Sequence, residues 1–212
     1  MLLKDLYFVR HGQTEWNAIR RMQGQWNSNL NDLGRQQADQ HGQMLRDKGI
    51  EHLFVSPLDR TRQTAEILNR HLALPVTFDD RIMEWDCGDW SGRFWDELIH
   101  EWPEEFASWR ADEFNYRGPN CENYPDMMQR AGEFLAHLST LDLERIAVVS
   151  HGMIGRVLVG VLLDMTPAGM LGFHQTNDTI FHVSRTRDGW TTRHYVGPEG
   201  PFDGLPERPP PG

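Results

Sequence analysis

The chain has 212 residues, of which 39% are hydrophobic and 25% are charged. This composition is typical of a globular protein of one or two domains and differs from that of disordered chains. With 21 Lys and Arg against 31 Asp and Glu, the formal net charge is −10. Sequence-independent nucleic-acid binding requires a basic surface, so we expect no nucleic-acid partner.

The sequence shows no sign of secretion or of a membrane anchor. Two cysteines are too few for a disulfide framework or a four-thiolate zinc site. The opening MLLKDLYFVRH contains no apolar run long enough for a signal peptide. The longest apolar stretch, at 157–163, is far shorter than the roughly 20 residues that cross a bilayer. We therefore expect a cytoplasmic protein without a membrane partner. The sequence contains no heptad repeat that would indicate an oligomeric state.

Short apolar segments alternate with segments of helical periodicity along the chain. Strands are predicted at 6–10, 53–56, 76–78, 146–150, 180–184 and 190–196. Helices are predicted at 32–48, 58–70, 127–138 and 153–163. This alternation predicts an α/β fold, a three-layer α/β/α sandwich with a mostly parallel mixed sheet.

Two of the predicted helices have recognisable start signals. In SPLD at 56–59, Ser56 is the expected N-cap and Pro57 the first helical residue. In NYPD at 123–126, Asn123 is the expected N-cap for the same reasons.

Two segments interrupt the strand and helix alternation. Residues 85–123 hold five of the eight tryptophans and little strand pattern, which predicts a partly helical cap inserted into a domain at 1–196. Residues 197–212 contain six Pro and four Gly, which predicts an extended C-terminal tail without a packed core of its own.

Two His-Gly pairs directly follow the most continuously apolar strands. His11 follows strand 6–10, whose last residue is Arg10, and His151 follows strand 146–150. Ligands of open α/β sheets bind beyond the carboxyl ends of the strands, so both histidines are expected to face one pocket. The glycine after each histidine allows a sharp turn and a close approach of backbone to ligand.

Arg60 is expected to lie in the first turn of the helix that follows strand 53–56. A helix N-terminus and a planar guanidinium both suit a phosphate group. We expect Arg10, Arg60 and His151 to bind one phosphoryl group, with His11 in line as the nucleophile. A nucleophilic imidazole must be neutral, with its other ring nitrogen donating to a fixed acceptor such as a backbone carbonyl.

Glu84 follows the predicted strand 76–78 and has large apolar neighbours in the sequence RIMEW at 81–85. Burial among such residues is expected to raise the pKa of its carboxyl group and keep it protonated near neutral pH. Glu84 is therefore the predicted general acid for the leaving alkoxide.

Four segments together resemble a known family. LYFVRHGQTEWNAIRRMQGQWNSNLNDLGRQQA at 6–38 resembles the opening of the histidine phosphatase (phosphoglycerate mutase-like) superfamily. VSPLDRTRQTAEIL at 55–68, RIMEWDCGDWSG at 81–92 and VVSHGMIGRVL at 148–158 follow in the family's order. The resemblance implies that His11 becomes the phosphohistidine and that Glu84 is the proton donor. It also implies that Arg10, Arg60, His151 and Asn17 bind the phosphoryl group, that Gln23 borders the site, and that no metal or cofactor is needed.

Within this family, GDWSG at 88–92 is similar to the small broad-specificity phosphatases. The resemblance thus implies a phosphomonoesterase that hydrolyses a small phosphorylated metabolite through a phosphohistidine. Many relatives carry P-x-G-E-S before the late helix, where this chain has PNCEN at 119–123. That change affects the cap side of the pocket and hence the choice of substrate. Phosphoglycerate mutase-type phosphotransfer, or a non-catalytic phosphoester- or protein-binding module of the same fold, are the alternatives.

Two other phosphatase chemistries fit the sequence less well. Cys87 and Arg93 have the C-x5-R spacing of cysteine-dependent phosphatases, but the acidic neighbours Glu84, Asp86 and Asp89 raise the pKa of the thiol. Ten histidines suggest a metal hydrolase, but the chain contains no H-E-x-x-H motif.

Overall fold

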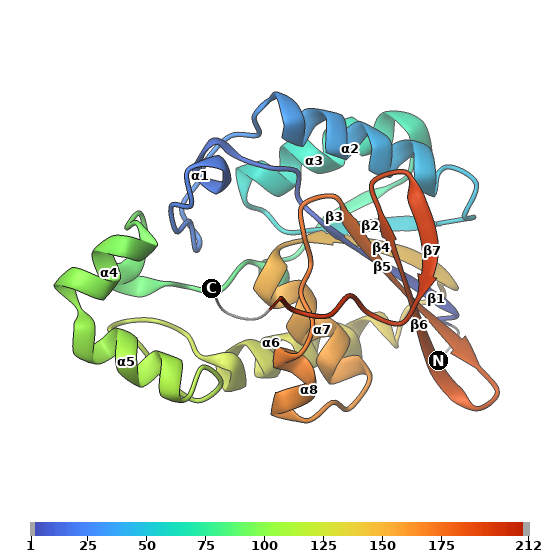
Figure 1. The fold of residues 1–212 in the computed structure, drawn as a ribbon. Helices are drawn as coiled ribbons and strands as arrows, with labels where there is room; N and C mark the ends of the chain where they lie inside the picture. The colour runs from blue at the N-terminus through green and yellow to red at the C-terminus, as the bar shows by residue number, and fades with distance from the viewer. Residues whose placement is uncertain (1–2, 210–212) are drawn as a thin grey trace.

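Seven strands form one mixed sheet in the computed structural model, which describes residues 3–209 (Figure 1). Their order across the sheet is β3-β2-β4-β1-β5-β6-β7. Strands β3, β2, β4 and β1 run parallel, and β5, β6 and β7 continue the sheet in antiparallel pairs. The bounds are β1 Asp5–Arg10, β2 His52–Val55, β3 Val76–Phe78, β4 Arg145–Ser150, β5 Thr179–Thr186, β6 Gly189–Val196 and β7 Glu199–Asp203.

Helices cover both faces of this sheet, which confirms the predicted three-layer sandwich (Figure 1). One face carries α2 (Asp32–Leu45) and α3 (Asp59–Leu72), and the other carries α6 (Tyr124–Leu138), α7 (Gly152–Leu162) and α8 (Pro167–Leu171). Within residues 3–209 no helix is both long and apolar enough to cross a membrane.

The central strands are apolar on both faces because each face packs against a helical layer. In β1, Leu6 and Phe8 belong to the core beneath α6 and α7. The alternate residues Tyr7 and Val9 belong to the core beneath α2 and α3. The near-continuous apolar runs in the sequence therefore reflect two cores on opposite sides of one sheet.

The start of α3 differs from its prediction. Its N-cap is Leu58, which makes no side-chain cap, so neither Ser56 as N-cap nor Pro57 as first helical residue is correct. The hydroxyl of Ser56 instead lies 2.7 Å from Nε2 of His151. A tertiary partner thus replaces the local backbone partner that the SPLD pattern predicts. At the start of α6 the prediction is confirmed, because Asn123 accepts a hydrogen bond from the backbone N–H of Asp126.

The segment predicted as a cap contains α4 (Trp95–Glu101) and α5 (Pro103–Ala111), preceded by the 3-10 turn η2 (Gly88–Trp90). Both helices lie beside the layer formed by α6, α7 and α8 (Figure 1). The ring of Trp95 lies 5.4 Å from that of Trp109 and 6.5 Å from that of Phe106, between centroids. These half-buried rings join the two short helices to the core.

The C-terminal segment differs from the extended tail that its composition predicts. Glu199–Asp203 form the edge strand β7, paired with β6. Pro201 lacks an N–H donor, which an edge strand tolerates. The strand was not predicted because a high proline content usually indicates a segment without a strand. After β7, Nη1 of Arg208 donates to both carboxylate oxygens of the cap residue Glu113, at 2.9 and 2.7 Å. Residues 210–212 of the predicted tail lie outside the described residues.

Candidate active site

The parallel pairing of β1 with β4 places two histidines at one edge of the sheet. Arg10 and Ser150 are register partners at the strand ends, and the backbone N–H of His11 donates to the carbonyl of Ser150 at 3.0 Å. The ring centroids of His11 and His151 are 5.2 Å apart, with their planes at 62°. Both rings are buried, with 2% and 0% of their surface exposed. The structure therefore brings together the two histidines that the strand ends single out.

His11 is held in the protonation state that a nucleophile needs. Its Nδ1 lies 2.8 Å from the carbonyl oxygen of Gly12, which can only accept, so Nδ1 carries the proton. Nε2 keeps its lone pair and has no hydrogen-bond partner within residues 3–209. Burial and the charges of Arg60 and Arg10 hold the pKa of His11 well below its ordinary value. Asn177 fixes the backbone by donating to the carbonyl of His11 at 2.8 Å.

Arg60 connects His151 to the loop that follows α1 (Glu15–Ala18). Its Nη1 and Nη2 donate to the carbonyls of Trp26 and Gly24, both at 2.7 Å, and its Nε donates to Nδ1 of His151 at 3.0 Å. The side chain is 1% exposed, and burial lowers its pKa to about 10, which still leaves a cation at neutral pH. Arg60 thus supplies a positive charge beside His151 and holds the loop at Gly24 and Trp26 next to it.

Both ring nitrogens of His151 are engaged within the protein. Nδ1 accepts from Arg60, so Nε2 carries the proton and donates to the hydroxyl of Ser56. Burial, and then the charge of Arg60, hold the pKa of His151 well below its ordinary value. A direct bond from His151 to a phosphoryl group therefore requires one of these two bonds to break.

Arg10 keeps a donor available at the end of β1. Its Nη1 donates to the carbonyl of Gln175, whereas its buried Nε has no hydrogen-bond partner among the described residues. A Cβ atom at position 152 would lie 3.2 Å from Cζ of Arg10, so the glycine at position 152 leaves room for the guanidinium. Such an unsatisfied N–H suits an anionic oxygen.

Glu84 follows the 3-10 turn η1 (Asp80–Ile82) and reaches the N-terminus of α7. Its Oε1 accepts from the backbone N–H groups of Trp85 at 2.9 Å and Ile154 at 3.1 Å, and its Oε2 accepts from that of Met153 at 3.3 Å. Backbone donors thus accompany the apolar neighbours that the sequence predicts, since Trp85 and Met153 line the same cavity as Glu84. These donors fix the position of the carboxylate.

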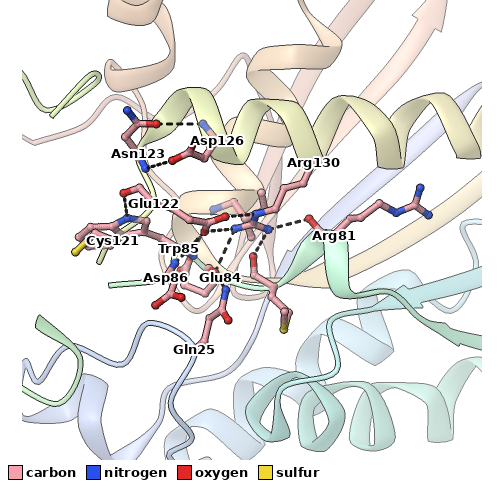
Figure 2. Close-up of polar contacts among 12 residues, drawn as sticks. Gln25, Arg81, Glu84, Trp85, Asp86, Cys121, Glu122, Asn123, Asp126 and Arg130 are labelled. Atoms are coloured by element: carbon pink, nitrogen blue, oxygen red, sulfur yellow. Dashed lines mark hydrogen bonds and ion pairs between the residues drawn. The ribbon is translucent and has the colours of Figure 1, made fainter. Parts of the chain in front are cut away.

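Arg130 of α6 supports the loop that carries Glu84 (Figure 2). Its Nη1 donates to the carbonyls of Arg81 at 2.8 Å and Met83 at 2.6 Å, and its Nη2 donates to that of Glu84 at 3.2 Å. Its Nε pairs with Oε1 of Glu122 at 2.9 Å. One guanidinium therefore fixes three successive parts of the loop.

Glu122 completes this support from the cap side (Figure 2). Its Oε2 accepts from the backbone N–H of Asp86 at 2.9 Å, and its carbonyl accepts from Nε1 of Trp85 at 2.6 Å. The sequence predicts no role at the site for Arg130, Glu122 or Ser56, and for Ser56 it predicts only a helix N-cap. The available signals were the glutamate retained in PNCEN and the place of Ser56 at the end of β2.

A cavity of about 170 Å³ lies among these groups, and we call it the strand-end pocket. It is lined by Arg10, His11, Asn17, Gln23, Arg60 and Glu84, with further residues of the same loops. His151 stands behind this lining. Cys87 also borders the pocket, but burial and the charge of Glu84 raise the pKa of its thiol well above its ordinary value. This does not fit the thiolate of a cysteine-dependent phosphatase.

Asn17 and Gln23 enter the strand-end pocket from the loop region around α1. The Oδ1 of Asn17 accepts from the backbone N–H of Thr14 at 3.2 Å in a capping box that begins α1. Gln23 is buried, and its Oε1 has no hydrogen-bond partner among residues 3–209. Both side chains thus border the cavity beside His11.

A second cavity of about 680 Å³ adjoins the first, and we call it the cap pocket. Its walls include Trp85, Trp95, Phe106, Trp109, Arg110 and Arg156. Trp85, Trp95 and Met153 line both cavities, so the two are neighbours.

Comparison with known proteins agrees with this geometry. A protein named "Probable phosphoglycerate mutase GpmB" from Erwinia tasmaniensis is 39% identical over 197 residues, covering 91% of this chain and 90% of that protein. The solved alpha-ribazole phosphatase of Shigella flexneri has a TM-score of 0.83 at 25% identity, covering 95% of this chain and 98% of that one. A mycobacterial glucosyl-3-phosphoglycerate phosphatase solved with VO3 has a TM-score of 0.80 at 27% identity, covering 89% and 97%.

The family model described as the histidine phosphatase superfamily (branch 1) matches residues 6–197. That range contains β1 from Leu6 onward, β2 to β6, and every residue of the strand-end pocket. The chain therefore belongs to branch 1 of the histidine phosphatase superfamily.

Proposed function

We propose that this protein is a phosphomonoesterase that hydrolyses a small phosphorylated metabolite through a phosphohistidine on His11. One observation carries this proposal: a neutral, buried His11 with its Nε2 free borders a cavity that Arg10 and Arg60 make positive. A free imidazole nitrogen beside fixed cations is the arrangement that nucleophilic attack on a phosphoryl group requires.

In the first step, Nε2 of His11 attacks phosphorus and the bond from phosphorus to the alcohol oxygen breaks. The carboxyl group of Glu84 donates its proton to that oxygen, so a neutral alcohol leaves. Arg10 and Arg60 stabilise the negative charge on the phosphoryl oxygens, and Asn17 and Gln23 add neutral polar groups on the same side.

In the second step, the carboxylate of Glu84 takes a proton from water while the water oxygen attacks phosphorus. The bond between phosphorus and Nε2 of His11 breaks, which releases inorganic phosphate and restores the neutral imidazole. Glu84 is again protonated and ready for the next substrate.

Phosphoglycerate mutase-type phosphotransfer is the second function to consider, because the protein from Erwinia tasmaniensis carries that name. The two reactions share the first step and differ in the acceptor. In the mutase reaction an alcohol group takes the phosphoryl group from His11, and no inorganic phosphate accumulates.

The test is hydrolysis of p-nitrophenyl phosphate between pH 5 and pH 8 in the presence of EDTA. We expect wild type and the control His137→Ala, exposed on α6, to release phosphate, and His11→Ala to release none. Residues 3–209 contain no group of three or more His, Cys, Asp or Glu side chains placed to hold a metal ion, so EDTA is expected to have no effect. Full activity in His11→Ala would contradict the proposal.

We also propose that the protein works in the cytoplasm. Cys87 and Cys121 are buried free thiols, which is usual for a reducing compartment. Cell fractionation tests this, and recovery with the secreted or membrane fraction would contradict it.

A further inference from the structure

The cap pocket is positively charged in a protein whose overall charge is −10. Among the described residues that line it, one carboxylate stands against four guanidinium groups. The carboxylate is that of Glu113, and the guanidinium groups are those of Arg20, Arg110, Arg156 and Arg208. Of these four arginines, Arg208 forms an ion pair with Glu113. The remaining positive charge favours an anion in this cavity.

Arg156 is the most deeply buried of these four arginines. Its side chain extends from α7, 7% of the residue is exposed, and its buried Nε has no hydrogen-bond partner among residues 3–209. Its Nη1 donates to the carbonyl of Phe173 at 3.4 Å, and its Cζ lies 5.6 Å from the ring centroid of Tyr124. No carboxylate of the described chain pairs with it. A buried arginine is normally paired, so Arg156 is suited to bind an anion from outside the chain.

The rest of the cap pocket suits an apolar body attached to that anion. Trp95, Phe106 and Trp109 present ring faces and edges on one side, and Met153 lies where the cap pocket meets the strand-end pocket. A volume of about 680 Å³ accommodates a group as large as a typical bound metabolite. A ligand with its phosphoryl group beside His11 can therefore extend past Met153 under these rings.

We propose that the cap pocket binds the alcohol part of the phosphomonoester, and that Arg156 binds a second anionic group on that part. The substrate class is thus a phosphomonoester with an aromatic or otherwise apolar body that carries a carboxylate or a second phosphate. This inference rests on the proposed function, because it places the reacting phosphoryl group in the strand-end pocket. Arg156 is a specificity residue in this scheme, and it takes no part in the bond changes at His11.

Three naphthyl substrates of one shape test this inference. They are 2-naphthyl phosphate, 6-carboxy-2-naphthyl phosphate and naphthalene-2,6-diyl bisphosphate. We expect wild type to have a higher kcat/KM for the two substrates with a second anion. The preferred one identifies that anion as carboxylate or phosphate.

The decisive variant is Arg156→Gln, which removes the charge and keeps a polar side chain. A hydrogen bond between charged groups contributes enough that we expect kcat/KM for the preferred substrate to fall by about tenfold or more. The loss is expected in KM, while 2-naphthyl phosphate is hydrolysed as by wild type. Arg156→Lys should recover part of the preference, and Arg70→Gln, exposed on α3 outside the pocket, should keep all of it.

An equal loss on all three substrates in Arg156→Gln would mean a structural role for this arginine and would overturn the inference. A wild type that hydrolyses all three equally well would also overturn it, while leaving the proposed function intact. Failure of the proposed function has a different signature, because wild type then releases phosphate from none of the three.

Discussion

The strand-end pocket and the cap pocket are neighbours built in different ways. The strand-end pocket has about 170 Å³ and takes its central groups, Arg10 and His11, from the end of a core strand. The cap pocket has about 680 Å³ and takes its walls from α4 and α5, from the C-terminal segment, and from Met153 and Arg156 of α7. We therefore expect the reaction to depend on residues at the strand ends, and the choice of substrate to depend on α7 and on the segments around the sheet.

Hydrogen bonding separates the two pockets further. Arg60 makes three hydrogen bonds, two of them to the buried residues His151 and Gly24, and the carboxylate of Glu84 accepts from three backbone N–H groups. In the cap pocket, Arg110 is exposed, and the rings of Trp95, Phe106 and Trp109 make apolar contacts with one another and with the core. Substitutions in the strand-end pocket should therefore affect every substrate, and those in the cap pocket should affect some substrates more than others.

Arg60→Lys is the strongest test of this contrast. Lysine keeps the charge but loses the planar fork that holds the loop at Gly24 and Trp26. Loss of one preorganised charge-stabilising group reduces kcat by about 10²–10³-fold, and we expect that loss on both 2-naphthyl phosphate and its 6-carboxy derivative. Arg62→Lys on the exposed side of α3 is the control. A loss confined to one substrate would contradict the contrast.

The pH dependence of the free energy of unfolding tests whether the buried histidines resist protonation in the folded protein. Burial lowers the pKa of His41 on α2 to about 4, from the ordinary histidine value of 6.5. Between these values the unfolded chain binds a proton that the folded chain does not, so stability falls as the pH falls below 6.5. His11 and His151 act in the same direction.

From pH 7 to pH 5, we expect the decrease in the free energy of unfolding to be about 2 kcal/mol smaller for His41→Leu than for wild type. Urea denaturation at both pH values measures this. The core variant Leu68→Ala should be destabilised by the same amount at both. A wild-type pH dependence in His41→Leu would show that the ring of His41 does not resist protonation.

Arg130→Met tests whether the cap side positions Glu84. General acid catalysis matters more for phenyl phosphate than for p-nitrophenyl phosphate, whose alcohol is a better leaving group. We expect kcat for phenyl phosphate to fall by about tenfold more than that for p-nitrophenyl phosphate. Arg81→Met breaks the pair with Asp79 and leaves the contacts of Arg130, so it should show no such difference. Equal losses on both substrates would indicate general damage to the fold.

The sequence predicts the sheet side of the molecule well because buried parallel strands are continuous apolar runs. The ends of those runs locate Arg10, His11 and His151, and the parallel register of β1 with β4 brings them together. The helices α2, α3, α6 and α7 follow from apolar periodicity, with bounds that differ by a few residues. These features depend on burial, which produces a periodic pattern of apolar residues in the sequence.

What the sequence does not show depends on partners that lie far apart in the chain. Ser56 can bond to a local N–H or to His151, and only the packing of β2 beside β4 decides between them. Arg130 binds backbone carbonyls, which any residue type supplies, so no motif marks its role. Strand β7 exists because β6 offers it an edge, and its own composition favours a loop.

The smallest expected effect comes from Arg208→Gln, which removes the ion pair between the C-terminal segment and Glu113 of the cap. Partly exposed ion pairs contribute little, so we expect kcat/KM for 6-carboxy-2-naphthyl phosphate to fall by about twofold to fivefold. Glu113→Gln combined with Arg208→Gln should lose no more than Arg208→Gln alone, because the pair is already broken. Hydrolysis of p-nitrophenyl phosphate should stay at the wild-type rate. If that small substrate were affected as strongly as the larger one, the C-terminal segment would act on the strand-end pocket, and the division between the two pockets would not hold.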